Sequence, residues 1–269
     1  MLLRFGGIGS VASDEARTQT WRSPDGGVWA TTVDAGGEVR IEFPSFGVAT
    51  LSRSSGEVTG YPDEGIDPET FRVRIEKEAY PVLYQAIGLV SLHASAVAIG
   101  DRVIALVGPT HAGKSTLAHA WCRLDPRARI VADDAVVVDP AKDFSVRELP
   151  FVPSLRSATR ARFGVPEDAV LERVAGRTDG VSRLVGALLL YPTSAAPTVD
   201  SIPAADAVLR LLPDAYCFLL SEADAARQFY ESMLDLVSRL PIRRLAYPHD
   251  FAALEATVAR IADATARWI

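Results

Sequence analysis

Residues 104 to 118 read IALVGPTHAGKSTLA, and this stretch decides how the rest of the chain is interpreted. It begins with an apolar run typical of a buried strand, passes through two glycines, and ends in residues that favour a helix. Gly108, Gly113, Lys114 and Ser115 match the spacing G-x-x-x-x-G-K-[ST]. The stretch therefore predicts a strand, a phosphate-binding loop and a helix in direct succession.

The chemistry of phosphate binding explains this spacing. Glycines let the backbone turn tightly, so that successive N–H groups point at phosphate oxygens, and the helix that follows adds its positive end. Lys114 supplies a charge for the β and γ phosphates, and the Ser115 hydroxyl is a ligand for Mg²⁺. We therefore expect ATP, or another nucleoside triphosphate, to bind with Mg²⁺. The expected nucleotide-binding residues are Gly108, Thr110, His111, Ala112, Gly113, Lys114, Ser115 and Thr116.

The plainest alternative is a glycine-rich turn that matches the pattern by chance. The apolar strand before it and the helix after it argue against chance, because a phosphate-binding loop requires that setting. Two nearby histidines are less informative. His111, inside the loop, could be an exposed spacer, and His119 on the following helix could serve packing alone.

A pair of aspartates, Asp133 and Asp134, ends the apolar run IVADD further along the chain. Adjacent strand residues face opposite ways, so without a bulge the two carboxylates cannot serve one atom in the same manner. This favours one carboxylate turned to a magnesium ion and the other to a nucleophile. Crowded carboxylates also raise one pKa, which suits a proton acceptor. An acidic surface turn is the alternative.

His93 lies in SLHASAVAI, a strand expected to pair with the loop strand through a Gly-Asp turn at residues 100–101. A lone histidine in an apolar strand is ordinarily a core residue, and the pattern itself does not assign it to the site.

Composition limits the class of protein. The 269 residues are 48% hydrophobic and carry a formal net charge of −6, which is typical of a soluble globular protein and argues against a broad basic surface for nucleic acid. Cys122 and Cys217 lie outside any metal-ligand spacing, which favours a reducing compartment. No apolar run has the length of a signal sequence or a membrane span. These features predict a cytoplasmic protein without nucleic-acid or membrane partners.

Two regions are expected. Residues 1–88 form a β-rich region with a connecting helix, which has Asp67 as N-cap and Pro68 at its first position, and which Pro81 kinks or splits. Residues 89–269 form an α/β domain of catalytic type. Its later strands are expected in FSVREL, near FVPSLR, in RLVGALLLY and in IRRLAY, and its later helices at 203–212, 222–239 and 250–267.

Together, LHASAVAIGDRVIALVGPTHAGKSTLAHAW and VADDAVVV resemble the HPr kinase/phosphorylase family, in its shorter HPr-kinase-like branch. The resemblance covers residues 80–140 well and continues weakly towards the end of the chain. It implies an α/β fold: a P-loop catalytic domain of HPr-kinase/PEP-carboxykinase-like type with a mixed sheet, preceded by a small β-rich region.

The resemblance also implies roles. Lys114 would hold the triphosphate, Ser115 and Asp133 would lie at the magnesium ion, and Asp134 would accept the proton of a substrate hydroxyl. His93 would support that aspartate electrostatically. Because family members phosphorylate a serine hydroxyl, the implied function is an ATP-dependent serine kinase. The alternatives are a kinase for a small hydroxylated metabolite and a nucleotide-binding regulator without catalysis.

The sequence departs from the family at the metal site and in the features that bear on the acceptor substrate. The later signature of the HPr enzyme, rich in glutamate, arginine and glycine and with its glutamate as a magnesium ligand, is absent, and Glu148 in RELPFVPSLR is the candidate to replace that glutamate. Arg156 and Arg243 could reach a phosphate, although both also read as surface arginines. Shorter members accompany peptide natural-product pathways, including lasso peptides. The expected partner is therefore a peptide or small protein with an acceptor serine, and a β edge of the N-terminal region is the expected docking place. The HPr enzyme forms oligomers, and the sequence leaves open whether this chain also forms a homo-oligomer.

Overall fold

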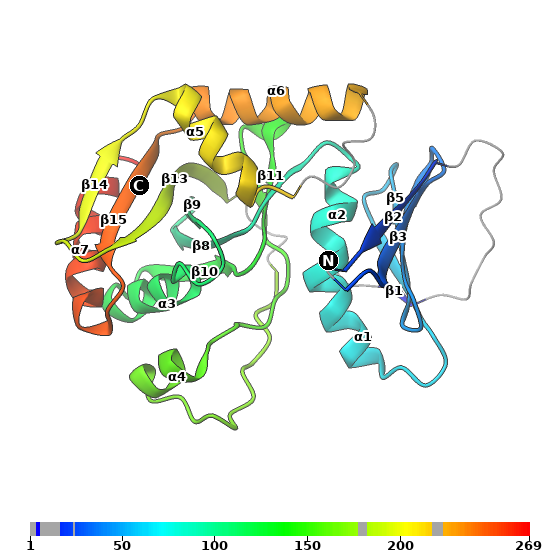
Figure 1. The fold of residues 1–269 in the computed structure, drawn as a ribbon, viewed down its shortest axis with the longest axis horizontal. Coiled ribbons are helices and arrows are strands. Elements are labelled where there is room, and N and C mark those ends of the chain that lie inside the picture. The colour runs from blue at the N-terminus through cyan, green and yellow to red at the C-terminus, as the bar shows by residue number, and fades with distance from the viewer. Residues whose placement is uncertain (1–3, 6–16, 24, 177–181, 217–222) are drawn as a thin grey trace. The chain divides into compact units, whose positions relative to one another are not determined.

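The computed structural model describes residues 4–5, 17–23, 25–176, 182–216 and 223–269 (Figure 1). The chain divides into two compact units, Met1–Gly88 and Leu89–Ile269. Cys217 lies outside the described residues.

The N-terminal unit is built on an antiparallel sheet to which one short parallel strand is added. Its order is β1 (Arg4–Phe5), β6 (Val58–Pro62), β5 (Gly47–Ser52), β4 (Glu38–Phe43), β3 (Val28–Asp34) and β2 (Arg17–Arg22). Burial alternates along β4, where Val39, Ile41 and Phe43 are buried, because successive side chains point to opposite faces of a sheet. The β-rich character expected of this region is confirmed.

A helical segment follows the sheet in three parts: α1 (Pro68–Arg74), a π-helical turn η1 (Ile75–Ala79) and α2 (Tyr80–Gln85). The Asp67 carboxylate accepts a hydrogen bond of 2.8 Å from the N–H of Thr70, so the expected N-cap is present. Pro81 lies in the first turn of α2, directly after the π-helical turn. The helical hydrogen bonds continue up to this point, since the Tyr80 N–H donates to the Ile75 carbonyl, and the proline, which has no N–H, follows the wide π-helical turn.

The C-terminal unit contains a mixed sheet. Its connected order is β10 (Ala128–Ala132), β8 (Ala94–Ile99), β9 (Arg102–Val107), β13 (Arg183–Thr193), β12 (Ser145–Arg147), β11 (Val136–Asp139) and β7 (Val90–Leu92), while β15 (Ile242–Pro248) pairs with β13 and with β14 (Thr198–Ser201). In the centre, β13 runs parallel to both β9 and β15. Most of the other pairings are antiparallel. The expected α/β unit with a mixed sheet is thus confirmed.

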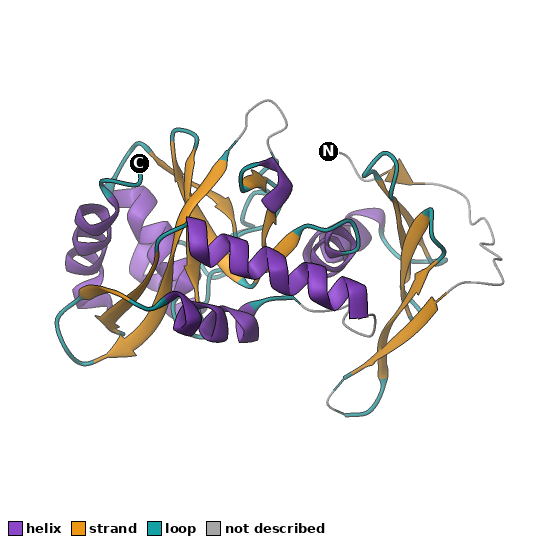
Figure 2. Cartoon of the chain, turned by 90° about the horizontal axis from the view of Figure 1, so that it is seen from above, coloured by secondary structure: helices purple, strands orange, loops and turns teal. Residues whose placement is uncertain are grey.

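Helices cover both faces of this sheet (Figures 1 and 2). They are α3 (Lys114–Leu124) and α7 (Leu254–Thr265) on one face and α5 (Ala204–Leu211) and α6 (Ala223–Arg239) on the other. Strand β9 shows why. Val103, Ala105 and Val107 pack with α5 and α6, whereas Ile104 and Leu106 pack with α3 and α7. A strand whose two faces are both covered by helices needs apolar side chains at successive positions. The near-continuous apolar run of β9 therefore predicts a buried strand.

Two segments for which strands were expected differ in the structure. SLHASAVAI is two strands: β7 pairs with β11, β8 pairs with β9 and β10, and His93 lies at the break between them. FVPSLR is not a strand, apart from an isolated bridge between Phe151 and Val174, and it leads into α4 (Ser157–Phe163). Short apolar runs do not reveal which partner each half will find, so the first division is invisible locally.

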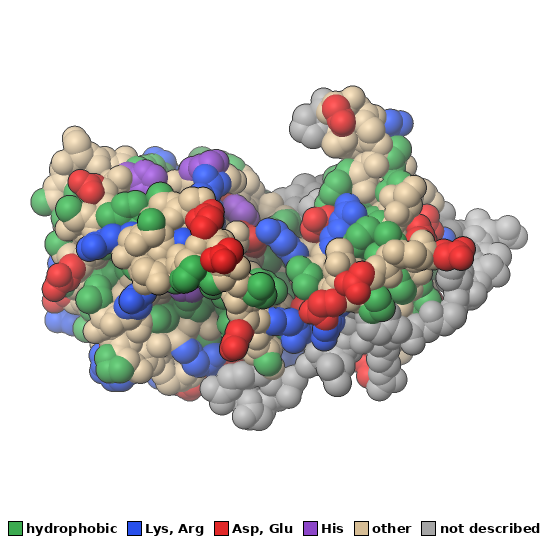
Figure 3. Space-filling model, turned by 90° about the horizontal axis from the view of Figure 1, so that it is seen from below, with side chains coloured by type: hydrophobic (Ala, Val, Ile, Leu, Met, Phe, Trp, Pro, Cys, Tyr) green, Lys and Arg blue, Asp and Glu red, His purple; other side chains and the backbone are tan. Residues whose placement is uncertain are grey.

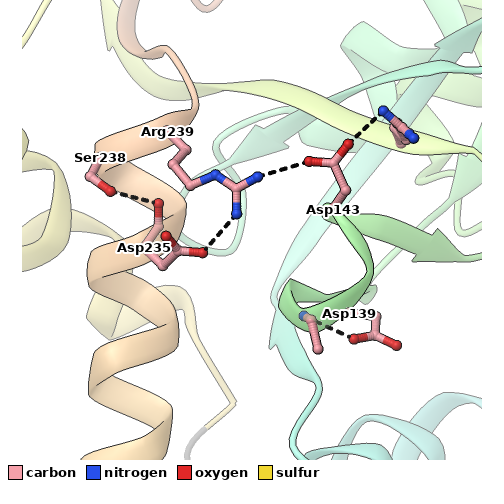
Figure 4. A network of polar contacts seen from close by, with 7 residues as sticks. Asp139, Asp143, Asp235, Ser238 and Arg239 are labelled. Atoms are coloured by element: carbon pink, nitrogen blue, oxygen red, sulfur yellow. Dashed lines mark hydrogen bonds and ion pairs between the residues drawn. The ribbon is translucent and has the colours of Figure 1, made fainter.

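Ion pairs join α6 to the turn between β11 and β12 (Figure 4). The Asp143 carboxylate accepts from Arg239 at 2.8 Å and from Arg183 at 2.5 Å, and Arg239 also reaches Asp235 at 3.2 Å. These side chains are about half exposed, so each pair contributes little to stability by itself.

None of the helices that the structure describes is long and apolar enough to cross a lipid bilayer.

Candidate functional site

The glycine-rich loop joins the carboxyl end of β9 to the N-terminus of α3. A hydrogen bond of 3.0 Å from the Ala112 N–H to the Pro109 carbonyl closes the turn, and Gly113 ends it with a φ of +85°. A Cβ atom on Gly113 would lie 2.9 Å from the hydroxyl oxygen of Tyr247. That hydroxyl donates to the Ala112 carbonyl, so Tyr247 on β15 fixes the loop from outside. Position 113 therefore favours glycine for two independent reasons, the positive φ and the lack of space for a Cβ atom.

Lys114 opens α3 and is almost entirely buried, at 7% exposure. Its ammonium group donates to the carbonyls of Gly108, at 2.6 Å, and Pro109, at 3.2 Å. Burial lowers the pKa of Lys114, while the neighbouring carboxylates of Asp214, Asp134 and Asp133 act against that shift. The lysine is thus held on main-chain oxygens of its own loop, where it can exchange them for anionic ones.

Asp133 receives hydrogen bonds on both carboxylate oxygens. One oxygen accepts from the hydroxyls of Ser95, at 2.6 Å, and Ser115, at 2.8 Å; the other accepts from the N–H of Ser154, at 3.2 Å. A hydroxyl has one hydrogen and two lone pairs. Because Ser115 gives its hydrogen to Asp133, its lone pairs stay available for a cation.

Asp134 has a left-handed backbone, with a φ of +71°. Its main-chain carbonyl accepts from two side chains, the His93 ring at 3.1 Å and the Tyr216 hydroxyl at 3.2 Å. The two rings meet edge to face, with centroids 6.3 Å apart. These contacts fix a conformation that residues other than glycine rarely adopt, and they leave Asp134 with surroundings unlike those of Asp133.

The electrostatic support of Asp134 by His93, which the resemblance implied, stays a prediction. The ring reaches the main-chain oxygen of Asp134, and since a carbonyl only accepts, Nδ1 carries the hydrogen. Burial, and next the charge of Lys114, lower the pKa of His93. A neutral imidazole with Nδ1 protonated results, and it acts on the backbone of Asp134.

One cavity of about 340 Å³ brings most of the predicted residues together. From the predicted set it is lined by His93, Thr110, His111, Gly113, Lys114, Ser115, Thr116 and Asp134. Gly108, Ala112 and Asp133 lie behind this lining: Gly108 and Ala112 in the loop, and Asp133 against Ser115. All four histidines of the chain belong to the C-terminal unit, where Figure 3 shows histidine side chains beside basic ones on one face.

No family model matches the chain, and no curated protein matches it. Among solved structures it is similar to the Hpr(Ser) kinase/phosphatase from Coxiella burnetii. The sequence identity is 11%, the alignment covers 66% of this chain and 91% of that one, and the TM-score is 0.33. Such a distant likeness leaves the side chains of the cavity as the basis for any functional conclusion.

Several site residues escaped the sequence analysis because their partners are distant along the chain. They are Ser95, Ser154, Thr159, Asp214, Tyr216 and Tyr247. Asp214 is an example. Its carbonyl accepts from the N–H of His93 at 2.6 Å, and burial raises the pKa of its carboxyl group against the opposing effects of Lys114 and His93. The segment LLPDAY carries no motif, so only an acid inside an apolar setting could have signalled it.

Glu148, the candidate for the further metal ligand, does not line the cavity and is engaged by other side chains. Arg129 binds both of its carboxylate oxygens, at 2.6 and 2.7 Å, and the Ser182 hydroxyl donates to one of them. Arg243 is also outside the cavity, since it donates to the Ala264 carbonyl and lies over the Trp268 ring. Across the described ranges, no cluster of three or more His, Cys, Asp or Glu side chains could enclose a metal ion.

We expect Glu148→Gln to lower stability and leave magnesium dependence unchanged. Glu148 is 5% exposed and Arg129 31% exposed, so the loss should be about 2 kcal/mol, below that for a fully buried pair. Urea unfolding measures the loss, and nucleotide affinity titrated against Mg²⁺ gives the second readout. A shifted magnesium requirement at unchanged stability would instead make Glu148 a ligand.

His93 should make the protein less stable in weak acid. Its folded pKa is lowered from the ordinary 6.5, so between the two values the unfolded chain binds more protons. Stability is then complete above pH 6.5 and falls as the pH drops towards the folded pKa. His119, whose pKa burial also lowers, adds a second contribution. Unfolding free energies measured from pH 7 to 5 should fall less steeply in His93→Asn, and an unchanged slope would contradict this assignment.

Proposed function

We propose that the chain is an ATP-dependent phosphotransferase that phosphorylates a serine hydroxyl of a peptide or small protein, with a lasso-type precursor peptide as one such substrate. One observation carries the proposal. Lys114 and Ser115 of a glycine-rich loop and the carboxylate-bearing Asp134 line the same cavity, while Asp133 holds Ser115 from behind. A phosphate-binding loop alone would fit many activities, but an aspartate facing it adds a group that can receive a proton.

The residues present fit Mg²⁺ as the accompanying ion. Ser115 offers its lone pairs and Asp133 a carboxylate, and both are oxygen donors, which this ion prefers. Magnesium usually keeps waters and takes substrate phosphates as further ligands, so two protein side chains suffice. When bound, it would neutralise charge on the phosphates.

In the proposed reaction, each of these side chains has a defined role. Asp134 orients the serine hydroxyl and takes its proton, the hydroxyl oxygen bonds to the γ-phosphorus, and the bond from that phosphorus to the β–γ bridging oxygen breaks. ADP leaves with the electron pair of the broken bond. Lys114 and the loop N–H groups stabilise the charge that spreads over the equatorial oxygens. His93 and Tyr216 keep Asp134 in place through its carbonyl.

The size of the cavity supports a macromolecular acceptor. At about 340 Å³ it lies near the lower end of the range for pockets that hold one small ligand. A nucleotide would occupy it, which leaves no enclosed space for a second small molecule. A serine on a peptide can approach from outside, where a freely diffusing metabolite would have few contacts.

Phosphate transfer to peptides tests the proposal. The full chain is mixed with Mg²⁺, γ-labelled ATP and a pool of synthetic peptides that each contain one serine, and a matched pool has alanine instead. Label in the serine pool alone is the expected result. Transfer only to small polyols would establish a metabolite kinase, and nucleotide binding without turnover would establish a regulator; either outcome overturns the proposal.

A further inference from the structure

The segment from Ser154 to Thr159 lines one side of the cavity and is attached at both ends. The Ser154 N–H donates to the Asp133 carboxylate at 3.2 Å. The buried Thr159 hydroxyl lies 3.0 Å from that of Thr116, in the first turn of α3. Between these attachments lies Arg156, whose backbone position is therefore fixed relative to the glycine-rich loop.

The Arg156 guanidinium contacts His111 of that loop. Nη2 lies 3.1 Å from Nε2 of the ring, and Nη1 contacts Nδ1. His111 occupies a left-handed backbone conformation, with a φ of +74°. A histidine in that conformation costs free energy that glycine would avoid, so its presence needs a reason beyond closing the turn. Holding Arg156 over the loop supplies that reason.

The charges of the cavity favour a phosphate ligand for this arginine. Among the described residues of the lining, Lys114 and Arg156 are the basic side chains other than histidine, and Asp134 and Asp250 are the acidic ones. The loop N–H groups suit the phosphates of a diphosphate, and Lys114 reaches the β and γ phosphates. A third phosphate brings more negative charge than one lysine and one divalent ion neutralise, and the planar guanidinium fork matches phosphate oxygens in pairs.

We propose that Arg156 recognises the terminal phosphate of the nucleotide, moving from His111 onto it, and so makes the site selective for a triphosphate over a diphosphate. This inference rests on the proposed function. The guanidinium adds its charge beside the transferred group, and ADP, which lacks that group, leaves Arg156 on His111. Product release is thereby favoured once transfer is complete.

Calorimetric titration of the full chain with ADP and with the non-hydrolysable β,γ-imido analogue of ATP, both with Mg²⁺, tests the inference. In Arg156→Met the triphosphate analogue should bind about 10- to 100-fold more weakly, as expected for a lost charge-assisted pair, while ADP affinity stays within about twofold. Arg156→Lys, which keeps the charge and loses the fork, should give an intermediate loss.

Arg162→Met is the matched control, because Arg162 lies exposed on α4, the helix that begins directly after Arg156, and does not line the cavity. It should change neither affinity. Equal weakening of both nucleotides in Arg156→Met, or no weakening, would overturn the inference while the proposed function stands. A wild-type chain that binds neither nucleotide would instead overturn the proposed function, and with it this inference.

Discussion

Asp134→Asn is expected to reduce phosphate transfer to a serine peptide by about 10²- to 10⁴-fold, the contribution of a positioned general base. Asparagine retains the shape of the side chain and tolerates the left-handed φ of +71° observed at this position. The carbonyl contacts with His93 and Tyr216 involve the main chain and should persist. The loss should therefore appear in kcat, with ATP binding preserved.

Single-turnover transfer from γ-labelled ATP and calorimetric titration with ATP separate these two quantities. Asp168→Asn is a suitable control, since Asp168 is exposed and does not line the cavity. Full activity in Asp134→Asn would refute the assignment of this residue as proton acceptor. Weakened ATP binding together with a lowered unfolding temperature would indicate a structural effect instead.

Lys114→Met should weaken binding of the triphosphate and lower transfer by about 10²- to 10³-fold, as for the loss of one preorganised charge. Methionine fills the path of the buried lysine stem, so the packing around α3 is retained while the charge is removed. Main-chain N–H groups would still contact the phosphates, which leaves residual binding.

Lys142→Met provides the comparison, because its side chain is 75% exposed and pairs only with nearby Asp139 among the ion pairs described. Affinities from calorimetry and initial rates of labelled transfer are the measurements. If Lys114→Met bound the β,γ-imido analogue as tightly as wild type does, the loop would not be a nucleotide site.

The sequence allowed accurate prediction where structure follows from neighbouring residues. The order of strand, glycine-rich loop and helix around Lys114, the N-cap at Asp67 and the turn at Gly100 all depend on local backbone preferences, and each is present. The same holds for the break at Asp133 and Asp134 between β10 and β11.

The features that could not be predicted depend on contacts between residues far apart in the sequence. Nothing near His93 shows that its flanking halves join different strands, or that its ring reaches a carbonyl 41 residues away. Glu148 matches a metal ligand by its type and position in the sequence, and only the fold brings Arg129 against both of its carboxylate oxygens. Arg156 could not be separated from a surface arginine, since its proximity to His111 arises only when α4 is tied to α3 through Thr159.

The hydrogen bond from Tyr247 to Ala112 has a consequence for synthesis of the chain. The two residues are 135 positions apart, so the glycine-rich loop leaves the ribosome long before the strand that shapes it. Nascent chains arrested before β15 should therefore fail to retain ATP, and chains released after it should retain it. Competence for the ligand would be acquired late in translation, as one of the last steps of maturation.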